Sequence, residues 1–387
     1  MLFRSAQKPN ILFILTDDQG YGDLSGTGHP YLKTPHMDQI GKEGVRLENF
    51  HVAPSCSPTR AGLQTGMHEF KSGVTHTKAG ERQQLALDRM NIGELLKTRG
   101  YTTGLFNKWH LGTPFPDKRG YDLYVYMQSP GPRETMMYWD PRVVINGKAK
   151  GDHRKGAFSP DVLTDQLLEA MERQVTENKD QPFAYFFWTI TPHGPVMAPE
   201  KYLERFRGKM TDTEAAYCAM VENLDDNVGR IMAKLKELEI DDNTLVILMN
   251  DNGSTEGGQL YNAGMRGLKT TAWPGGTRAF SYWRWPGTLK PREEQALTGY
   301  VDVFPTFAEL AGAEIPADHA SELDGYSLVD LLKSPDGAFP RDRLLFTHGA
   351  RWESGFAEQH KYTQAGVHQG DYLAIRIDTC PCKEGVC

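Results

Sequence analysis

The sequence has little of several features that define large classes of protein. It contains no run of 18 apolar residues, so we expect no membrane-spanning segment. Asp and Glu (50 residues) outnumber Lys and Arg (43 residues), and the resulting net charge of −7 argues against general binding to nucleic acid. Residues 1–9 lack the apolar stretch of a signal peptide, so no leader is visible at this end.

Cysteine is also scarce. There are five cysteines among 387 residues, and Cys380, Cys382 and Cys387 crowd together at the end. An odd number with this spacing does not form a disulfide framework. The terminal three leave a soft-metal site, a redox pair and a truncated end as alternatives, of which we favour the last. Cys218 is expected to lie in the core.

Short apolar runs alternate with helical patterns along the chain. Three runs read as buried strands, at residues 10–16, 183–190 and 244–249. Apolar residues at helical spacing indicate helices at residues 159–177, 211–238 and 301–311, the second with Thr211 or Thr213 as its N-cap. This alternation predicts an α/β fold with a mostly parallel central sheet and helices on both faces.

Acidic residues directly follow two of the predicted strands. Asp17 and Asp18 end the first, and Asp251 and Asn252 follow the third. Because ligands bind beyond the carboxyl ends of parallel strands, we expect the two pairs to converge on one crevice. Their oxygens suit Ca²⁺ or Mg²⁺ rather than Zn²⁺, and three carboxylates repel one another unless a cation neutralises them. The alternative is that each pair only caps a helix or makes a turn.

The segment CSPTR at residues 56–60, followed by TG at 65–66, carries the most specific signal. It resembles the signature of the type I sulfatases of the alkaline phosphatase superfamily, whose cysteine is oxidised after translation to formylglycine. Six other stretches resemble segments of this family in the same order, namely residues 9–24, 100–112, 191–195, 250–253, 266–278 and 300–312. Two positions depart from the pattern, because Asn107 replaces a glycine and Pro274 replaces a glutamate.

The resemblance implies a catalytic role for several residues. Formylglycine derived from Cys56 would act as the nucleophile, because its hydrate has one hydroxyl that attacks sulfur and a second that loses a proton to expel sulfate. A serine at this position would be trapped as a stable sulfate ester. Lys108, His193 and Lys269 would bind the substrate, the two lysines at the sulfate oxygens. His193, helped by Lys269, would protonate or hydrogen-bond the leaving oxygen, and His110 would be the base that promotes sulfate release.

The resemblance also implies a metal site and a place for Arg60. Arg60 lies one helical turn after the nucleophile, so its guanidinium is expected to reach back to the hydrate. His110 lies two residues after Lys108, and in an extended segment both would face the same side. The divalent cation, Ca²⁺ ahead of Mg²⁺, would be held by Asp17, Asp18, Cys56 in its modified form, Asp251 and Asn252.

The predicted function is therefore the hydrolysis of aryl or carbohydrate sulfate monoesters. We expect a catalytic α/β domain at residues 1–320 and the start of a smaller, incomplete C-terminal subdomain at 321–387, with specificity set by residues 113–158. The implied partners are a sulfated small molecule or glycan and a formylglycine-generating or anaerobic sulfatase-maturating enzyme. Most members of the family are exported. Two alternatives stay open, a phosphodiesterase or phosphonate monoester hydrolase of the same superfamily and an inactive protein that binds sulfated glycans.

Overall fold

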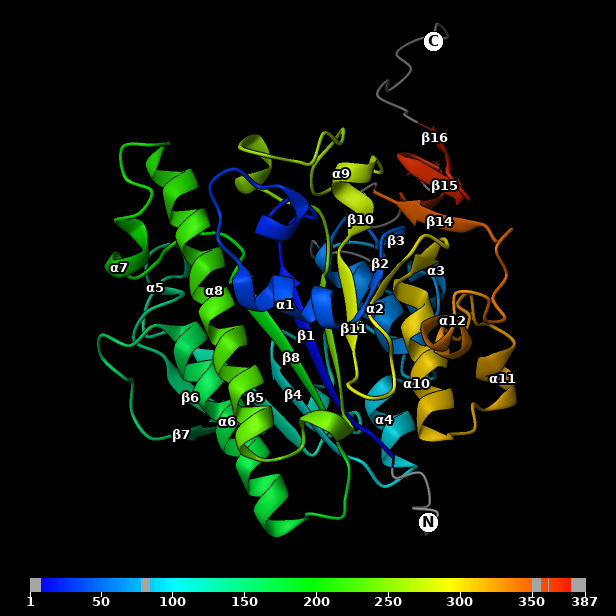
Figure 1. Ribbon diagram of the computed structural model, residues 1–387, viewed down its shortest axis with the longest axis horizontal. Helices are drawn as coiled ribbons and strands as arrows, with labels where there is room; N and C mark the ends of the chain where they lie inside the picture. Colours follow the sequence, from blue (N-terminus) through cyan, green and yellow to red (C-terminus); the bar gives the residue numbers. More distant parts are fainter. Residues whose placement is uncertain (1–7, 78–83, 350–355, 361, 377–387) are drawn as a thin grey trace, which may run out of the picture.

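A ten-stranded sheet forms the centre of the protein in a computed structural model, which describes residues 8–77, 84–349, 356–360 and 362–376. In spatial order its strands are β12 (Arg292–Glu294), β2 (Val45–Leu47), β11 (Ser281–Arg284), β9 (Thr244–Asn250), β1 (Asn10–Asp17), β8 (Phe183–Pro192), β4 (Thr102–Asn107), β5 (Leu123–Gln128), β6 (Arg142–Ile145) and β7 (Lys148–Lys150). The five strands from β9 to β5 are parallel, whereas β11, β6 and β7 run antiparallel to their neighbours. The predicted mostly parallel centre is confirmed (Figure 1).

Strand β1 shows why helices must cover both faces of the sheet. Its side chains alternate between two apolar clusters, with Ile11, Phe13 and Leu15 in one and Leu12 and Ile14 in the other. All five are fully buried. Since successive residues of a strand point to opposite faces, an apolar strand of this kind is stable only between two helical layers.

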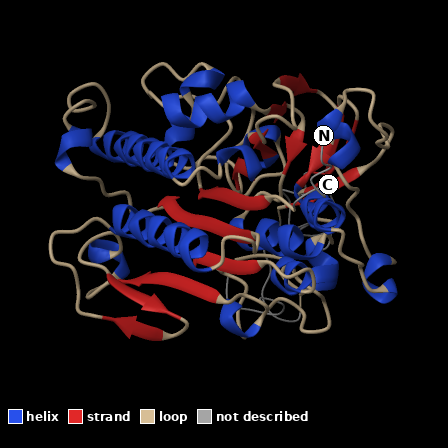
Figure 2. Ribbon diagram, turned by 60° about the horizontal axis from the view of Figure 1, so that its bottom comes forward, coloured by secondary structure: helices blue, strands red, loops and turns tan. Residues whose placement is uncertain are grey.

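Two groups of helices supply these layers (Figure 2). One face of the sheet is covered by α1 (Pro35–Glu43), α6 (Ser159–Glu177) and α8 (Asp212–Glu237), and the other by α2 (Cys56–Thr65), α4 (Ile92–Lys97), α10 (Val303–Ala311) and α12 (Val329–Lys333). Helix α6 has the predicted bounds. Helix α8 begins after Thr211, whose hydroxyl accepts a hydrogen bond from the Glu214 N–H as an N-cap. Cys218 of α8 is buried, as expected.

Shorter elements connect these layers. The short helices are α3 (Glu69–Ser72), α5 (Arg133–Met136), α7 (Glu200–Leu203), α9 (Pro274–Thr277), α11 (Ala317–Ala320) and α13 (Ala357–His360). The 3-10 turns are η1 (Ser25–Thr27), η2 (Pro116–Lys118), η3 (Asp241–Asn243), η4 (Gly257–Gln259) and η5 (Tyr300–Asp302). Two small sheets consist of β10 (Arg278–Ala279), β3 (Phe50–His51) and β13 (Thr298–Gly299), and of β14 (Leu345–His348), β15 (Ala365–Gln369) and β16 (Tyr372–Arg376).

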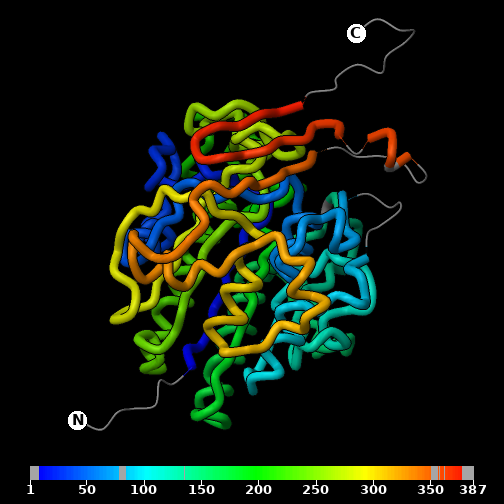
Figure 3. Tube along the Cα trace, turned by 90° about the vertical axis from the view of Figure 1, so that its right-hand side faces the viewer, coloured from blue at the N-terminus to red at the C-terminus, as the bar shows by residue number. Residues whose placement is uncertain are grey.

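The antiparallel sheet β14–β16 lies at the end of the molecule toward which β1 runs (Figures 1 and 3). Residues beyond position 320 also enter the main core, because Leu328, Leu331 and Leu345 are buried in the same cluster as α2 and α10. The division of the chain at 320/321 stays a prediction. Cys380, Cys382 and Cys387 lie outside the described residues. No helix among the described residues combines the length and apolarity needed to cross a membrane.

Candidate active site

The carboxyl ends of β1 and β9 bring the two acidic pairs together. Asp17 is the last residue of β1, Asp251 follows β9 directly, and the two strands are parallel neighbours. The backbone N–H of Asp18 donates to Asp251 Oδ1 at 3.3 Å, and the Asn252 side-chain amide donates to Asp18 Oδ1 at 2.9 Å. All four side chains are buried. The convergence expected from the strand positions is therefore present in the folded chain.

The oxygen atoms at this junction suit a hard divalent cation. Two buried oxygens, Asp17 Oδ1 and Asn252 Oδ1, have no hydrogen-bond partner among the described residues. Ligand atoms of Asp17, Cys56 and Asp251 lie within 4.8 Å of one another. Buried polar atoms are normally paired, and carboxylate and amide oxygens are the ligands that Ca²⁺ and Mg²⁺ prefer. The donor set thus fits either of these ions.

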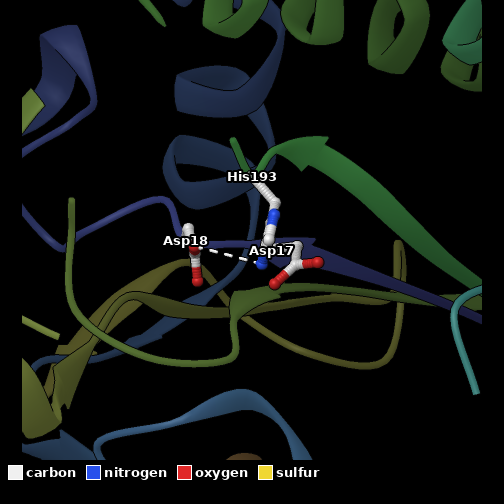
Figure 4. A group of neighbouring side chains, drawn as sticks. All are labelled: Asp17, Asp18 and His193. Carbon is white, nitrogen blue, oxygen red and sulfur yellow. Dashed lines mark ion pairs between the residues drawn. The ribbon is translucent and has the colours of Figure 1, made fainter. Parts of the chain in front are cut away.

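His193 approaches the same junction from the segment after β8. Figure 4 shows its imidazole beside Asp17 and Asp18, and Nε2 lies 3.7 Å from Asp18 Oδ2. Its Nδ1 atom lies 2.6 Å from the carbonyl oxygen of Gly194. Burial lowers the pKa of His193, although the nearby carboxylates oppose this shift. The acidic pair therefore favours the protonated imidazole that burial disfavours.

Two lysines neutralise the carboxylates that end β1. The ammonium of Lys108 donates to Asp17 Oδ2, and that of Lys269 donates to Asp18 Oδ1. Burial alone would raise the pKa of Asp17, but the charges of Lys108, His193, Arg60 and Lys269 outweigh it and hold this pKa well below its usual range. Both lysines are mostly buried, with 12% and 14% of their side chains exposed. Cationic charge is thus concentrated at the site of an otherwise acidic protein.

Cys56 is the first residue of helix α2 and faces this cluster. It is only 1% exposed, and its Sγ atom lies 3.4 Å from His110 Nδ1. Burial raises the pKa of the Cys56 thiol, although the charge of Lys108 opposes the shift. An unmodified thiol here is therefore protonated at neutral pH, and a protonated thiol is a poor nucleophile.

Arg60 lies one turn after Cys56 and connects three parts of the site. Its Nε and Nη2 atoms donate to Asp251 Oδ2 at 3.1 and 2.9 Å, and Nη1 donates to the carbonyl of Lys108 at 2.8 Å. The side chain is fully buried. Burial and the charge of Asp17 raise the pKa of Asp251 to about 7 even though Arg60 opposes them. The hydrogen bonds of Arg60 thus run to Asp251 and the end of β4.

Lys108 and His110 both face the site, as expected, but the segment after β4 that carries them is not extended. Asn107 and His110 have φ values of +84° and +58°, in the left-handed region. Glycine enters this region without strain and asparagine does so more readily than most residues, which accounts for Asn107 at a glycine position. Burial and the charge of Lys108 lower the pKa of His110 to about 3, so its imidazole is neutral at pH 7.

Several residues that support the site were missed by the sequence analysis. The Tyr138 hydroxyl is hydrogen-bonded to the carbonyls of Ile190 and His193, and Tyr217 donates to the carbonyl of Asp18. Arg133 places Nη2 at 3.3 Å from His193 Nδ1. Arg133 and Tyr138 belong to the stretch 113–158, which has no regular apolar spacing. A single sequence gives no signal for such contacts.

Comparison with known proteins agrees with this geometry. Residues 9–313 match the profile of the family described as Sulfatase. Human arylsulfatase A is 30% identical over 94% of this chain and 76% of its own length. Human N-acetylgalactosamine-6-sulfatase is 31% identical over 97% of this chain and 75% of its own length. Mouse arylsulfatase J is 29% identical over 93% of this chain, which spans 63% of that protein.

Solved structures show the same fold. The crystal structure of Ps i-CgsB in complex with a neocarrahexaose superposes with a TM-score of 0.83 at 25% identity, covering 97% of this chain and 85% of that one. The phosphonate monoester hydrolase of Agrobacterium radiobacter superposes with a TM-score of 0.70 at 19% identity, covering 95% and 87%. The fold and the site thus define an α/β protein of the alkaline phosphatase superfamily. Within it, the chain belongs to the sulfatase family, whose relatives above are named as sulfuric ester hydrolases.

Proposed function

We propose that this protein hydrolyses sulfate monoesters of aryl or carbohydrate alcohols, with formylglycine made from Cys56 as the nucleophile. The observation that carries the proposal is the position of Cys56, which lies 3.4 Å from His110 and shares one cluster with Asp17 and Asp251. As a buried thiol with a raised pKa it would be a weak nucleophile, so the site gains its chemistry only when this residue is modified.

The neighbouring side chains are suited to the two halves of the reaction. The formylglycine hydrate supplies one hydroxyl that attacks sulfur and a second whose loss of a proton releases sulfate. His110 Nδ1 lies 3.4 Å from Cys56 Sγ, so we assign it the acceptance of that proton. His193 lies beside Asp18 of the acidic cluster, where it would donate a proton or a hydrogen bond to the leaving alcohol.

The metal ion and the two lysines would together neutralise the negative charge of the sulfate group. We assign the cation to Asp17, Asp18, Asp251 and Asn252, and to residue 56 after modification. The unpaired oxygens of Asp17 and Asn252 support this assignment, for which we propose Ca²⁺ ahead of Mg²⁺. A divalent cation bound there supplies Lewis-acid charge at a sulfate oxygen. The ammonium groups of Lys108 and Lys269 would then turn from the carboxylates to the remaining sulfate oxygens.

Arg60 supports both the proposed metal site and Lys108. Its two hydrogen bonds to Asp251 hold one proposed metal ligand in place, and its third bond fixes the carbonyl of Lys108. Arg60 lies one turn into the helix that carries Cys56. We therefore assign it the role of holding Asp251 and the backbone of Lys108 in place.

Maturation of Cys56 requires a partner. Because the side chain is 1% exposed in the folded protein, an oxidising enzyme would have to reach it before folding is complete. We propose a formylglycine-generating enzyme or an anaerobic sulfatase-maturating enzyme in this role.

The test compares two classes of ester on protein produced together with a maturation enzyme. We expect kcat/KM for 4-nitrophenyl sulfate to exceed that for bis(4-nitrophenyl) phosphate, and the Cys56→Ala variant to turn over neither. Preference for the phosphate diester would favour the phosphodiesterase or phosphonate hydrolase alternative, for which the structural likeness to a phosphonate monoester hydrolase is the motivating observation. Calcium-dependent binding of sulfated glycans without turnover would favour the inactive binding protein.

A further inference from the structure

A cavity opens beside the proposed catalytic residues. It has a volume of about 530 Å³ and lies between the carboxyl ends of β4, β5 and β8, the short helix α5 and the start of α6. Lys108 and His110 form its wall on the side of Cys56. Its volume falls within the range of small-molecule sites and exceeds what a sulfate group fills, so the cavity has room for the alcohol part of an ester.

The walls of this cavity are part apolar and part cationic. Met127, Met137, Leu163 and Ile190 supply apolar surface, which suits a sugar or aromatic ring. The described lining residues include no carboxylate, whereas Lys108 and Arg133 both contribute positive charge. Lys108 is already paired with Asp17. Arg133 is paired with no carboxylate among the described residues, so its charge is uncompensated at the cavity.

The contact between Arg133 and His193 leaves the guanidinium available to an anion. His193 Nδ1 lies 2.6 Å from the Gly194 carbonyl and 3.3 Å from Arg133 Nη2. A carbonyl oxygen only accepts, so the shorter contact requires a proton on Nδ1. An Nδ1–H that donates to Gly194 has no lone pair for Arg133, and the two contacts are therefore alternatives. With the shorter one formed, Arg133 has no acceptor at this ring.

The segment that carries Arg133 is anchored to the loop that carries His193. Tyr138 is fully buried, and its hydroxyl is hydrogen-bonded to the carbonyls of Ile190 and His193. Arg133 lies five positions before Tyr138, at the start of α5. This anchor sets the guanidinium at one edge of the His193 ring, while the opposite edge faces Asp18 at 3.7 Å. The two positions are one imidazole apart, a separation that two substituents of a single ring can span.

We propose that the cavity holds the alcohol part of the substrate and that Arg133 binds a second anionic group on it, a sulfate or a carboxylate. The preferred substrates are then sulfate esters that carry a further negative charge on the same or the adjoining ring. A guanidinium binds sulfate and carboxylate alike through paired N–H donors. The two ligand pairs of the test below distinguish these anions. This inference rests on the proposed sulfatase function, because it places the ester at Cys56.

The test measures binding without turnover. Cys56→Ala protein is titrated calorimetrically with two matched pairs of ligands. One pair is 4-carboxyphenyl sulfate and its methyl ester, which keeps only the sulfate charge, and the other is glucosamine-2-N,6-O-disulfate and N-acetylglucosamine-6-sulfate. The titrations are repeated with Arg133→Met and Arg133→Lys added. Arg173→Met, which removes an exposed arginine of α6 outside the cavity lining, serves as the matched control.

We expect the dianionic member of a pair to bind more tightly, and Arg133→Met to lower the ratio of the two affinities by about 10- to 100-fold, the size of a charged hydrogen bond. Arg133→Lys should give an intermediate ratio and Arg173→Met the parental one. A response in one pair identifies the anion as carboxylate or sulfate. If the Arg133 variants give affinity ratios within twofold of the parent for both pairs, the inference is overturned. If Arg133→Met does not fold, the ratios of Arg133→Lys decide in the same way. If these ratios are as expected but the matured protein does not hydrolyse sulfate esters, the proposed function is overturned instead.

Discussion

The buried pair between Arg343 and Asp302 allows a quantitative prediction. The side chains are 1% and 0% exposed, and Arg343 Nη1 donates to both carboxylate oxygens at 2.7 and 2.6 Å. Removing one partner of a buried pair costs about 3–5 kcal/mol. Asp302 keeps two backbone donors, the N–H groups of Gly299 and Tyr326 at 2.8 Å each. We therefore expect Arg343→Met to lower the free energy of unfolding by about 3 kcal/mol, at the lower end of that range.

The loss of unfolding free energy caused by Arg343→Met should depend on pH. Burial raises the pKa of Asp302 although Arg343 opposes the shift, and without Arg343 the pKa rises further. A carboxyl whose pKa is higher in the folded than in the unfolded state favours folding at low pH, and this contribution is lost as the pH rises through the folded pKa. The cost of Arg343→Met is therefore smaller at pH 5 than at pH 8, by at most about 1.4 kcal/mol per pH unit.

Equilibrium denaturation in guanidinium chloride at these two pH values measures the effect. The parent is compared with Arg343→Met, Asp302→Asn and the double variant, whose loss should be smaller than the sum of the single losses. Arg341→Met is the matched control, because Arg341 is half exposed where it pairs with Glu294 and its loss should cost less than about 1 kcal/mol. Additive single losses, or a cost of Arg343→Met equal to that of the control, would show that the pair does not stabilise the fold in this way.

Four further predictions concern the site. Cys56→Ser should accumulate a sulfate ester on the protein after one turnover, visible by mass spectrometry as a stable adduct. Lys269→Met should lower kcat/KM for a sulfate ester by about 10²- to 10³-fold with an unchanged circular dichroism spectrum, because it removes a donor at the developing charge; a loss below threefold would contradict its role. Asn107→Ala should cost about 1–2 kcal/mol in unfolding free energy because φ is +84°, whereas Asn107→Gly should not. Chelation with EDTA should lower the thermal unfolding temperature, and Ca²⁺ at a hundred times its Kd should restore about 2.7 kcal/mol.

Much of the central fold follows from local patterns. The apolar runs at β1, β8 and β9 and the helical spacing in α6 and α8 were sufficient because each element is long and buried on a regular face. The convergence of Asp17 with Asp251 also followed from the sequence. The two residues lie at the carboxyl ends of strands that are parallel neighbours, so they meet at the same edge of the sheet.

Other features depend on contacts that no local pattern encodes. The left-handed backbone of Asn107 and His110 is imposed by the turn after β4, and it replaces the extended segment that the spacing suggested. The hydrogen bonds of Arg60 to Asp251 join residues 191 positions apart. Arg133 reaches the site from a segment without periodicity, so only its distance from His193 identifies it.

Mass spectrometry of the Cys56 peptide, measured together with turnover, shows whether formylglycine at residue 56 is the nucleophile. Protein made with graded amounts of a maturation enzyme should contain a graded fraction of aldehyde at residue 56, detectable by loss of sulfur and by reaction with a hydrazide. Sulfate ester hydrolysis should rise in proportion to this fraction and should be absent when residue 56 is entirely thiol. Full sulfatase activity in protein whose Cys56 is unmodified would contradict it.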